Sequence, residues 1–165
     1  MSARTICEKI RGGEPAPSKP IWNNKPFARR GLIARLRGMS GNSRKLVTEA
    51  LLLQQEGHLT AALAKFQLAL SAPKMNPNFA LALRERSAHI MHEIAQQKLR
   101  PDAKKNALGL AADEYTAAAE YAKENISEPQ LAVHLYICAR DIYTEIGEAR
   151  AAEKAHNEAL SIGGN

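Results

Sequence analysis

The segment from Ala62 to Ala69, ALAKFQLA, decides the fold, because its pattern returns twice later in the chain. An alanine is followed four positions later by a large ring residue, and three positions after that by a second alanine. The three sets are Ala62, Phe66 and Ala69; Ala111, Tyr115 and Ala118; and Ala152, His156 and Ala159. Small residues four positions before and three positions after the ring let paired helices touch closely, while the ring fills the space toward the next pair. The pattern therefore predicts a repeated helical hairpin.

The spacing of apolar residues around these segments predicts an all-α fold. Alanine and leucine dominate from Leu46 onward, aromatic residues make up only 5% of the 165 residues, and 45% are apolar. Helices are expected at about 43–57, 59–71, 78–98, 101–124, 127–147 and 149–162. The third of them carries one apolar stripe, formed by Phe79, Leu83, Ile90 and Ile94.

Local signals set the expected ends of these helices. Asn42 or Ser43 is expected to cap the first helix, and Ser127 resembles the start of a capping box for the fifth. Pro101 suits the first turn of the fourth helix, where Asp102 meets the positive helix end. Gly57 and Gly147 are expected to end the first and fifth helices.

The last hairpin carries the most specific signature, formed by Tyr136, Ala139, Tyr143, Gly147, Ala152 and Ala159. With these residues the chain resembles the tetratricopeptide repeat (TPR) family. The first hairpin agrees at Leu53, Gly57, Ala62, Phe66, Ala69 and Pro73. It departs at Glu49, where the family usually has leucine. Family repeats are about 34 residues long, so the spacings of 49 and 41 residues between the alanine sets imply longer helices or inserts around the middle hairpin. About three TPR-like hairpins are expected.

The resemblance implies a protein-binding role, because many TPR proteins hold peptides in the groove formed by the first helix of each hairpin. One subclass clamps the terminal carboxylate of chaperones with lysine and asparagine. Val47 and Leu51 stand at the matching positions here and cannot donate to a carboxylate. Binding of chaperone tails is therefore not expected.

The charge divides the chain into two parts. Residues 1–45 carry eleven lysines and arginines against two glutamates, a net charge of +9, whereas the rest carries twelve against fifteen, a net charge of −3. This asymmetry predicts a basic N-terminal arm at 1–42, a helical domain at 43–163 and a short tail at 164–165. A basic arm suits an anionic partner such as RNA, an acidic protein or a lipid surface, and it is also compatible with a solvated tail.

Prolines and glycines between Gly12 and Pro26 predict an extended path for much of the arm. Trp22 and Phe27 are candidates to anchor the arm on a partner or on the helical domain itself. The stretch from Phe27 to Met39 is consistent with one short basic amphipathic helix. The candidate partner-binding arginines are Arg29, Arg30, Arg35 and Arg37.

No motif in the sequence points to catalysis. Phosphate-binding glycine loops and nucleophile elbows are absent. The nearest candidate for a metal site is formed by Glu85, His89, His92 and Glu93, which can share a helical face. Metal sites in helical bundles usually draw ligands from facing helices, so solvated side chains are the favoured interpretation. We expect a non-enzymatic protein without cofactor or metal.

Two functions remain in competition. The first is an adaptor or scaffold subunit that binds a protein segment in a larger complex. The second is an RNA-associated subunit, for example of an organellar ribosome, whose arm contacts phosphates. Peripheral membrane binding through the arm is a third alternative.

Cys7 and Cys138 form no disulfide pattern, which predicts a reducing intracellular compartment. The arginine-rich arm is typical of mitochondrial targeting but follows Glu8 and Glu14, so mitochondrion and cytoplasm both stay open. No integral membrane segment is expected.

Overall fold

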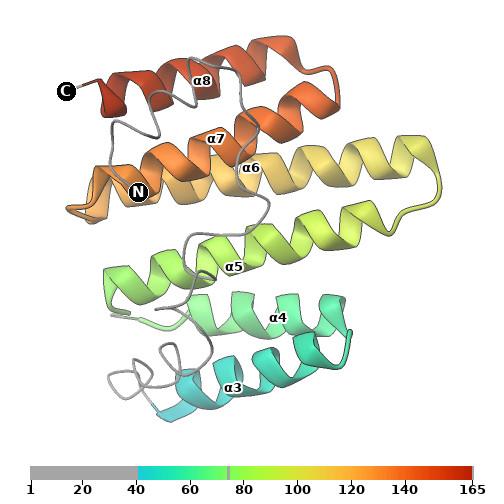
Figure 1. Ribbon diagram of the computed structural model, residues 1–165. Helices are drawn as coiled ribbons and strands as arrows, with labels where there is room; N and C mark the ends of the chain where they lie inside the picture. The colour runs from blue at the N-terminus through green and yellow to red at the C-terminus, as the bar shows by residue number, and fades with distance from the viewer. Residues whose placement is uncertain (1–40, 74, 165) are drawn as a thin grey trace.

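A computed structural model describes residues 41–73 and 75–164, and within these ranges every regular element is an α-helix. Figure 1 shows the helices stacked in chain order, each beside the next. They are α3 (Gly41–Gln55), α4 (Leu59–Leu70), α5 (Pro77–Gln96), α6 (Pro101–Asn125), α7 (Pro129–Glu145) and α8 (Ala149–Gly163). The predicted all-α fold is confirmed, and each predicted helix is present.

Proline begins three of the described helices. Pro77, Pro101 and Pro129 are the first residues of α5, α6 and α7. A first-turn residue has no helical acceptor for its N–H, so proline loses nothing there and its fixed φ suits the helix. Asp102 lies in the first turn of α6, as predicted, with its carboxylate at the positive end of the helix dipole.

The two predicted side-chain caps are wrong. The residue before α7 is Glu128, and no side chain caps the helix there. Pro129 takes the first helical position, which leaves Ser127 one residue too early to act as the cap. At the other site, α3 already includes Gly41, so Asn42 and Ser43 lie inside the helix rather than before it.

The same backbone turn joins α3 to α4 and α7 to α8. Gly57 has φ of 82° and Gly147 has φ of 78°, a left-handed conformation that favours glycine. Around Gly57, the His58 N–H donates to the Leu53 carbonyl at 2.8 Å, and the Gly57 N–H donates to the Gln54 carbonyl at 3.2 Å. The bonds around Gly147 repeat this register and these two distances. Both turns are Schellman motifs.

The buried side chains form two apolar clusters that share α5. The smaller cluster joins α3, α4 and one side of α5, through Val47, Ala50, Leu51, Ala62, Phe66, Ala69, Leu83 and Ile90. The larger cluster joins the other side of α5 to α6, α7 and α8. The residues of α5 that belong to the larger cluster are Leu81, Ala88 and Ala95. The predicted stripe of α5 is thus confirmed, and a second stripe on the same helix faces the larger cluster.

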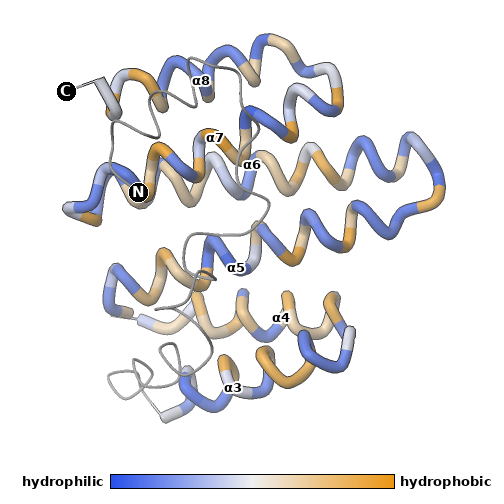
Figure 2. Tube along the Cα trace, viewed as in Figure 1, coloured by the Kyte–Doolittle hydropathy of each residue, from blue (hydrophilic) through white to orange (hydrophobic). Residues whose placement is uncertain are grey.

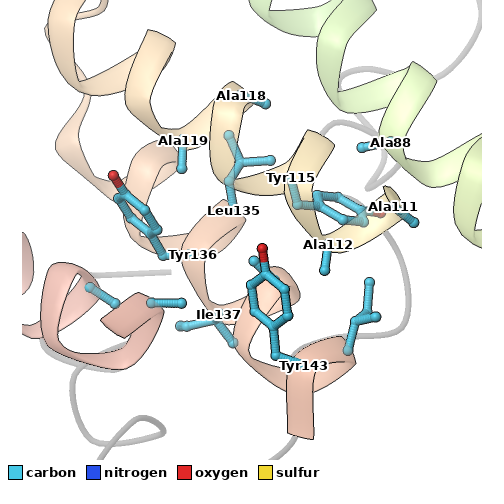
Figure 3. Close-up of a cluster of buried hydrophobic side chains, with 14 of the residues drawn as sticks. Ala88, Ala111, Ala112, Tyr115, Ala118, Ala119, Leu135, Tyr136, Ile137 and Tyr143 are labelled. Carbon is cyan, nitrogen blue, oxygen red and sulfur yellow. The ribbon is translucent and has the colours of Figure 1, made fainter. Parts of the chain in front are cut away.

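Small residues let α6 approach its neighbours closely. Ala111, Ala112, Ala118, Ala119 and Ala122 are between 0% and 1% exposed. Figure 3 shows the ring of Tyr115 directed from α6 toward Ala88 of α5, and the rings of Tyr136 and Tyr143 projecting from α7. The larger cluster is therefore a close-packed alanine framework whose gaps are filled by tyrosine rings.

Replacing Ala118 or Ala159 by leucine is expected to destabilise the fold. Both alanines are 0% exposed, so a larger side chain must displace its neighbours. Overpacking of this kind typically costs about 1–3 kcal/mol. The matched control is Ala117→Leu, because Ala117 is exposed on the same helix as Ala118. Chemical denaturation of the three variants measures the difference, and equal stability of Ala117→Leu and Ala118→Leu would contradict the expectation.

Candidate binding face on the alternate helices

Side-chain contacts show that alternate helices lie next to one another in two rows. Arg86 Nε on α5 donates to Gln54 Oε1 on α3 at 2.6 Å, and Gln96 Nε2 on α5 lies 3.5 Å from Glu145 Oε1 on α7. In the other row, Lys123 of α6 pairs with Glu158 of α8 at 3.0 Å. We call the side formed by α3, α5 and α7 the first-helix face.

A row of polar side chains runs along α5 on this face. Arg86, His89, Glu93 and Gln96 follow one another at spacings of three and four, which places them on one side of the helix. His89 Nε2 lies 3.3 Å from Glu93 Oε1, and the side chain of Glu93 is 41% exposed. Since the two ends of the row contact α3 and α7, the row crosses the middle of the first-helix face.

Burial sets the protonation state of the two histidines on α5. It lowers the pKa of His89, although Glu93 opposes the shift, and it lowers the pKa of His92, which Glu145 opposes. Both imidazoles are therefore neutral at pH 7. His92 Nε2 lies 3.1 Å from Gln96 Nε2, which suits a neutral ring nitrogen that accepts the amide hydrogen. The histidines thus supply hydrogen-bonding groups to the face rather than charge.

The four residues considered as metal ligands do not converge. Glu85 is 6% exposed, whereas His89 faces Glu93 and His92 faces Gln96. Across residues 41–73 and 75–164, no group of three or more histidine, cysteine or acidic side chains has the arrangement needed to hold a metal ion.

Another histidine lies beside the cysteine of α7. Cys138 Sγ is 3.6 Å from His134 Nε2, one helical turn away. Burial raises the pKa of the Cys138 thiol, with a further contribution from the negative charge of Glu85. Burial also lowers the pKa of His134 to about 4. Both groups are neutral at pH 7, so the geometry supports a buried S–H···N contact, and the electrostatics oppose the thiolate that a cysteine nucleophile needs.

The residues that define the alanine and ring pattern lie at the contacts between helices. Ala62, Phe66 and Ala69 belong to the smaller cluster. The larger cluster holds Ala111, Tyr115, Ala118, Tyr136, Tyr143, Ala152 and Ala159. His156, the ring of the third set, is partly exposed, and its Nδ1 has no hydrogen-bond partner within the described chain. It lies on the last helix of the stack, where no described hairpin follows.

The tyrosines of α7 connect the two rows of helices. Tyr143 donates a hydrogen bond of 2.6 Å to Asp113 Oδ1 on α6, and burial together with this bond raises the pKa of Tyr143 to about 12. Burial also raises the pKa of Tyr136 to about 12, and Glu158, Glu120 and Glu124 contribute. Both phenols stay protonated at neutral pH, and both rings belong to the packed framework that holds the face.

The predicted arm residues Trp22, Phe27, Arg29, Arg30, Arg35 and Arg37 lie outside the described residues. Val47 and Leu51, at the positions of the chaperone clamp, are 0% and 7% exposed. They belong to the smaller cluster rather than to a surface that could meet a carboxylate.

Sequence reasoning did not predict the side-chain contacts between neighbouring helices of the first-helix face. Arg86 and Gln54 are 32 residues apart, and Gln96 and Glu145 are 49 apart. The spacing of three and four along α5 is a signal that could have identified one polar side of this helix. The partner across the face depends on how the hairpins stack, which no local spacing encodes.

Among the described helices, none is both long and apolar enough to cross a bilayer. Comparison of the chain with protein-family models, with curated proteins and with solved structures finds no match.

Proposed function

We propose that this chain is a non-catalytic protein-binding subunit of a larger assembly, built from TPR-like hairpins, which holds a segment of its partner against the first-helix face. The observation that carries the proposal is the polar row of Arg86, His89, Glu93 and Gln96 across the middle of that face. The resemblance to the TPR family assigns peptide binding to the same side of the hairpins.

The repeated geometry of the first and last hairpins supports the TPR-like part of the proposal. Gly57 and Gly147 adopt the same left-handed turn and lie 90 residues apart. The alanines that follow them, Ala62 with Ala152 and Ala69 with Ala159, keep the same separation. The middle hairpin differs, because α5 and α6 have 20 and 25 residues, whereas α3 and α4 have 15 and 12. Longer helices account for the long spacing between the alanine sets.

The chemistry of the row suits an extended polypeptide. Arginine donates, glutamate accepts, and neutral histidine and glutamine can each do both, so the row can meet the N–H and C=O groups of a peptide as well as its polar side chains. Glu93 and Gln96 are both exposed enough to meet such a ligand. The apolar clusters below keep the helices in place.

Site-specific photo-crosslinking tests this proposal. A photoreactive amino acid is placed at Glu93 in the full chain, and at Asn157 on the exposed side of α8 as the matched control. Crosslinked peptides are identified by mass spectrometry from extracts of the source cells. We expect one recurrent partner segment at Glu93 that is absent at Asn157. Equal products at both positions, or none at Glu93, would overturn the assignment of the face.

The RNA-associated alternative is favoured by the charge of +9 on residues 1–45. Replacing Arg29, Arg30, Arg35 and Arg37 together by glutamine is expected to weaken binding to an anionic partner and to flatten its salt dependence. Each phosphate contact contributes about 0.7–0.9 to the logarithmic salt slope, so four lost contacts should reduce the slope by about 3.

The measurement compares binding to RNA, to anionic vesicles and to the crosslinked protein partner across a salt series, for the full chain, the four-arginine variant and residues 41–165. Retention of full affinity for the cellular partner by the truncated form would leave the first-helix face as the binding surface. Loss of RNA binding alone would identify the arm as an RNA-contacting element.

A further inference from the structure

The α3–α4 hairpin exposes an apolar surface on the side turned away from its core. Leu52 of α3 is 46% exposed and Leu68 of α4 is 56% exposed. Ala61 and Ala64 are exposed on the same part of α4. Figure 2 shows hydrophobic colours along most of α4. We call the surface formed by Glu49, Leu52, Ala61, Ala64, Lys65 and Leu68 the hairpin outer face.

An ion pair places these residues on one surface. Lys65 Nζ lies 2.7 Å from Glu49 Oε2, which joins α4 to α3. Leu52 is three residues after Glu49, and Leu68 is three residues after Lys65, so each leucine lies one turn from its half of the ion pair on the same helical face. Ala61 lies four residues before Lys65. Each half of the ion pair thus has a leucine one turn away, and Lys45 lies one turn before Glu49.

The opposite end of the helix stack has a different character. The exposed residues on the outer side of α8 are Arg150, Glu153, Lys154, Asn157 and Ser161. Stacked helical repeats need such polar outer faces at their ends to stay soluble. The hairpin outer face differs, because four of its six residues are apolar, although α3 also exposes Lys45, Thr48 and Glu56. Its apolar side chains offer a contact to another surface.

We infer that the hairpin outer face binds the same face of a second copy of this chain, as a two-fold symmetric dimer. A two-fold axis parallel to the helices places α3 of each copy against α4 of the other. Lys65 of one copy then faces Glu49 of the second, and Leu52 faces the small Ala61. An axis perpendicular to the helices would bring Glu49 against Glu49, so charge complementarity selects the first arrangement.

The polar surface of α8 limits the assembly to two copies. Each copy uses the same patch in the dimer, so no patch is left to bind a third copy, and the exposed polar residues of α8 offer no second apolar surface.

The size of the hairpin sets the strength of the dimer. Helices of 15 and 12 residues are about 22 and 18 Å long, and two of them are about 20 Å wide. The resulting footprint of about 400 Å² is smaller than the roughly 800 Å² per partner of a standard interface. A weak dimer that depends on concentration is expected.

The dimer leaves the first-helix face accessible. Gln54 lies two residues from Leu52, about 200° around the helix, and it contacts Arg86 on the first-helix face. The two surfaces therefore lie on opposite sides of α3. This inference does not depend on the proposed function, and a dimer would present two copies of the first-helix face to a partner.

Sedimentation equilibrium of the full chain over a concentration series tests the inference. We expect a monomer–dimer equilibrium, and loss of the dimer in the double variant Leu52→Asp, Leu68→Asp. The matched control is Leu110→Asp, because Leu110 is 59% exposed on α6, away from this face. A chain that stays monomeric at every concentration, or a dimer that survives in the double variant, would overturn the inference.

The ion pair allows a test that does not depend on the leucines. Glu49→Lys leaves two lysines on the face and Lys65→Glu leaves two glutamates, so each variant alone should dimerise less than the native chain. An equimolar mixture of the two variants should form a heterodimer, because lysines of one then face glutamates of the other. Helical circular dichroism of both variants checks that they fold. Absence of the heterodimer in a mixture of folded variants would contradict the α3-against-α4 arrangement.

Discussion

Phe66→Ala is expected to destabilise the α3–α4 hairpin by about 3–5 kcal/mol, the range found when a buried phenylalanine is truncated. The ring of Phe66 is 0% exposed and is the largest fully buried side chain of the smaller cluster. That cluster includes only one side of α5, so the loss should fall on α3, α4 and this side of α5. The larger cluster keeps its own contacts.

Amide hydrogen exchange of the native state measures this local loss, because protection reports the free energy of opening for each helix. We expect strongly reduced protection in α3 and α4, with α6, α7 and α8 nearly unchanged. Gln67→Ala is the control, since Gln67 is exposed on the same helix. An equal loss of protection in all helices would show that the two clusters unfold as one unit.

The second large effect concerns pH. His134 is 4% exposed, and burial lowers its pKa to about 4, below the ordinary value of 6.5. The unfolded chain therefore binds this proton first as the pH falls. Stability associated with neutral His134 is fully present above about pH 6.5 and is lost as the pH falls through 4. At about 1.4 kcal/mol for each unit of pKa, the loss reaches about 3 kcal/mol.

Urea denaturation of the native chain and of His134→Gln between pH 7 and pH 4 measures this contribution. The difference in free energy of unfolding between the two proteins should move by about 3 kcal/mol in favour of the variant. His58→Gln replaces an exposed histidine and serves as the control. A difference that stays constant with pH would show that His134 is solvated when it takes up its proton.

The presence of the helices could be predicted from local sequence, whereas the packing of α5 could not. The stripe of Phe79, Leu83, Ile90 and Ile94 is the strongest apolar period on that helix, and it faces the smaller cluster. The second stripe consists of Leu81, Ala88 and Ala95, in which two of three residues are alanine. Alanine is common on both exposed and buried helix surfaces, so the spacing of these residues does not identify a buried face in the sequence. Its burial follows from the close approach of the alanine-rich α6.

The sequence implies where a binding face would lie, whereas the contacts on that face depend on the packed fold. The resemblance to TPR proteins implies binding on the first helix of each hairpin, and the polar spacing of Arg86, His89 and Glu93 is visible in the sequence. Arg86 and Gln54 are 32 residues apart in the sequence, and their contact depends on how the first two hairpins stack. The neutral state of His89 depends on its burial, which is a property of the packed fold.

The distribution of aromatic residues over the two clusters has a consequence for optical spectroscopy. All four tyrosines of the chain, Tyr115, Tyr121, Tyr136 and Tyr143, lie on α6 and α7, and the single tryptophan is Trp22. Tyrosine signals in near-ultraviolet circular dichroism therefore report on the larger cluster, whereas far-ultraviolet signals report on every helix. Two melting curves that coincide would indicate one cooperative transition. In Phe66→Ala, the far-ultraviolet curve should begin to fall first, which makes the separation of the two clusters visible without labels.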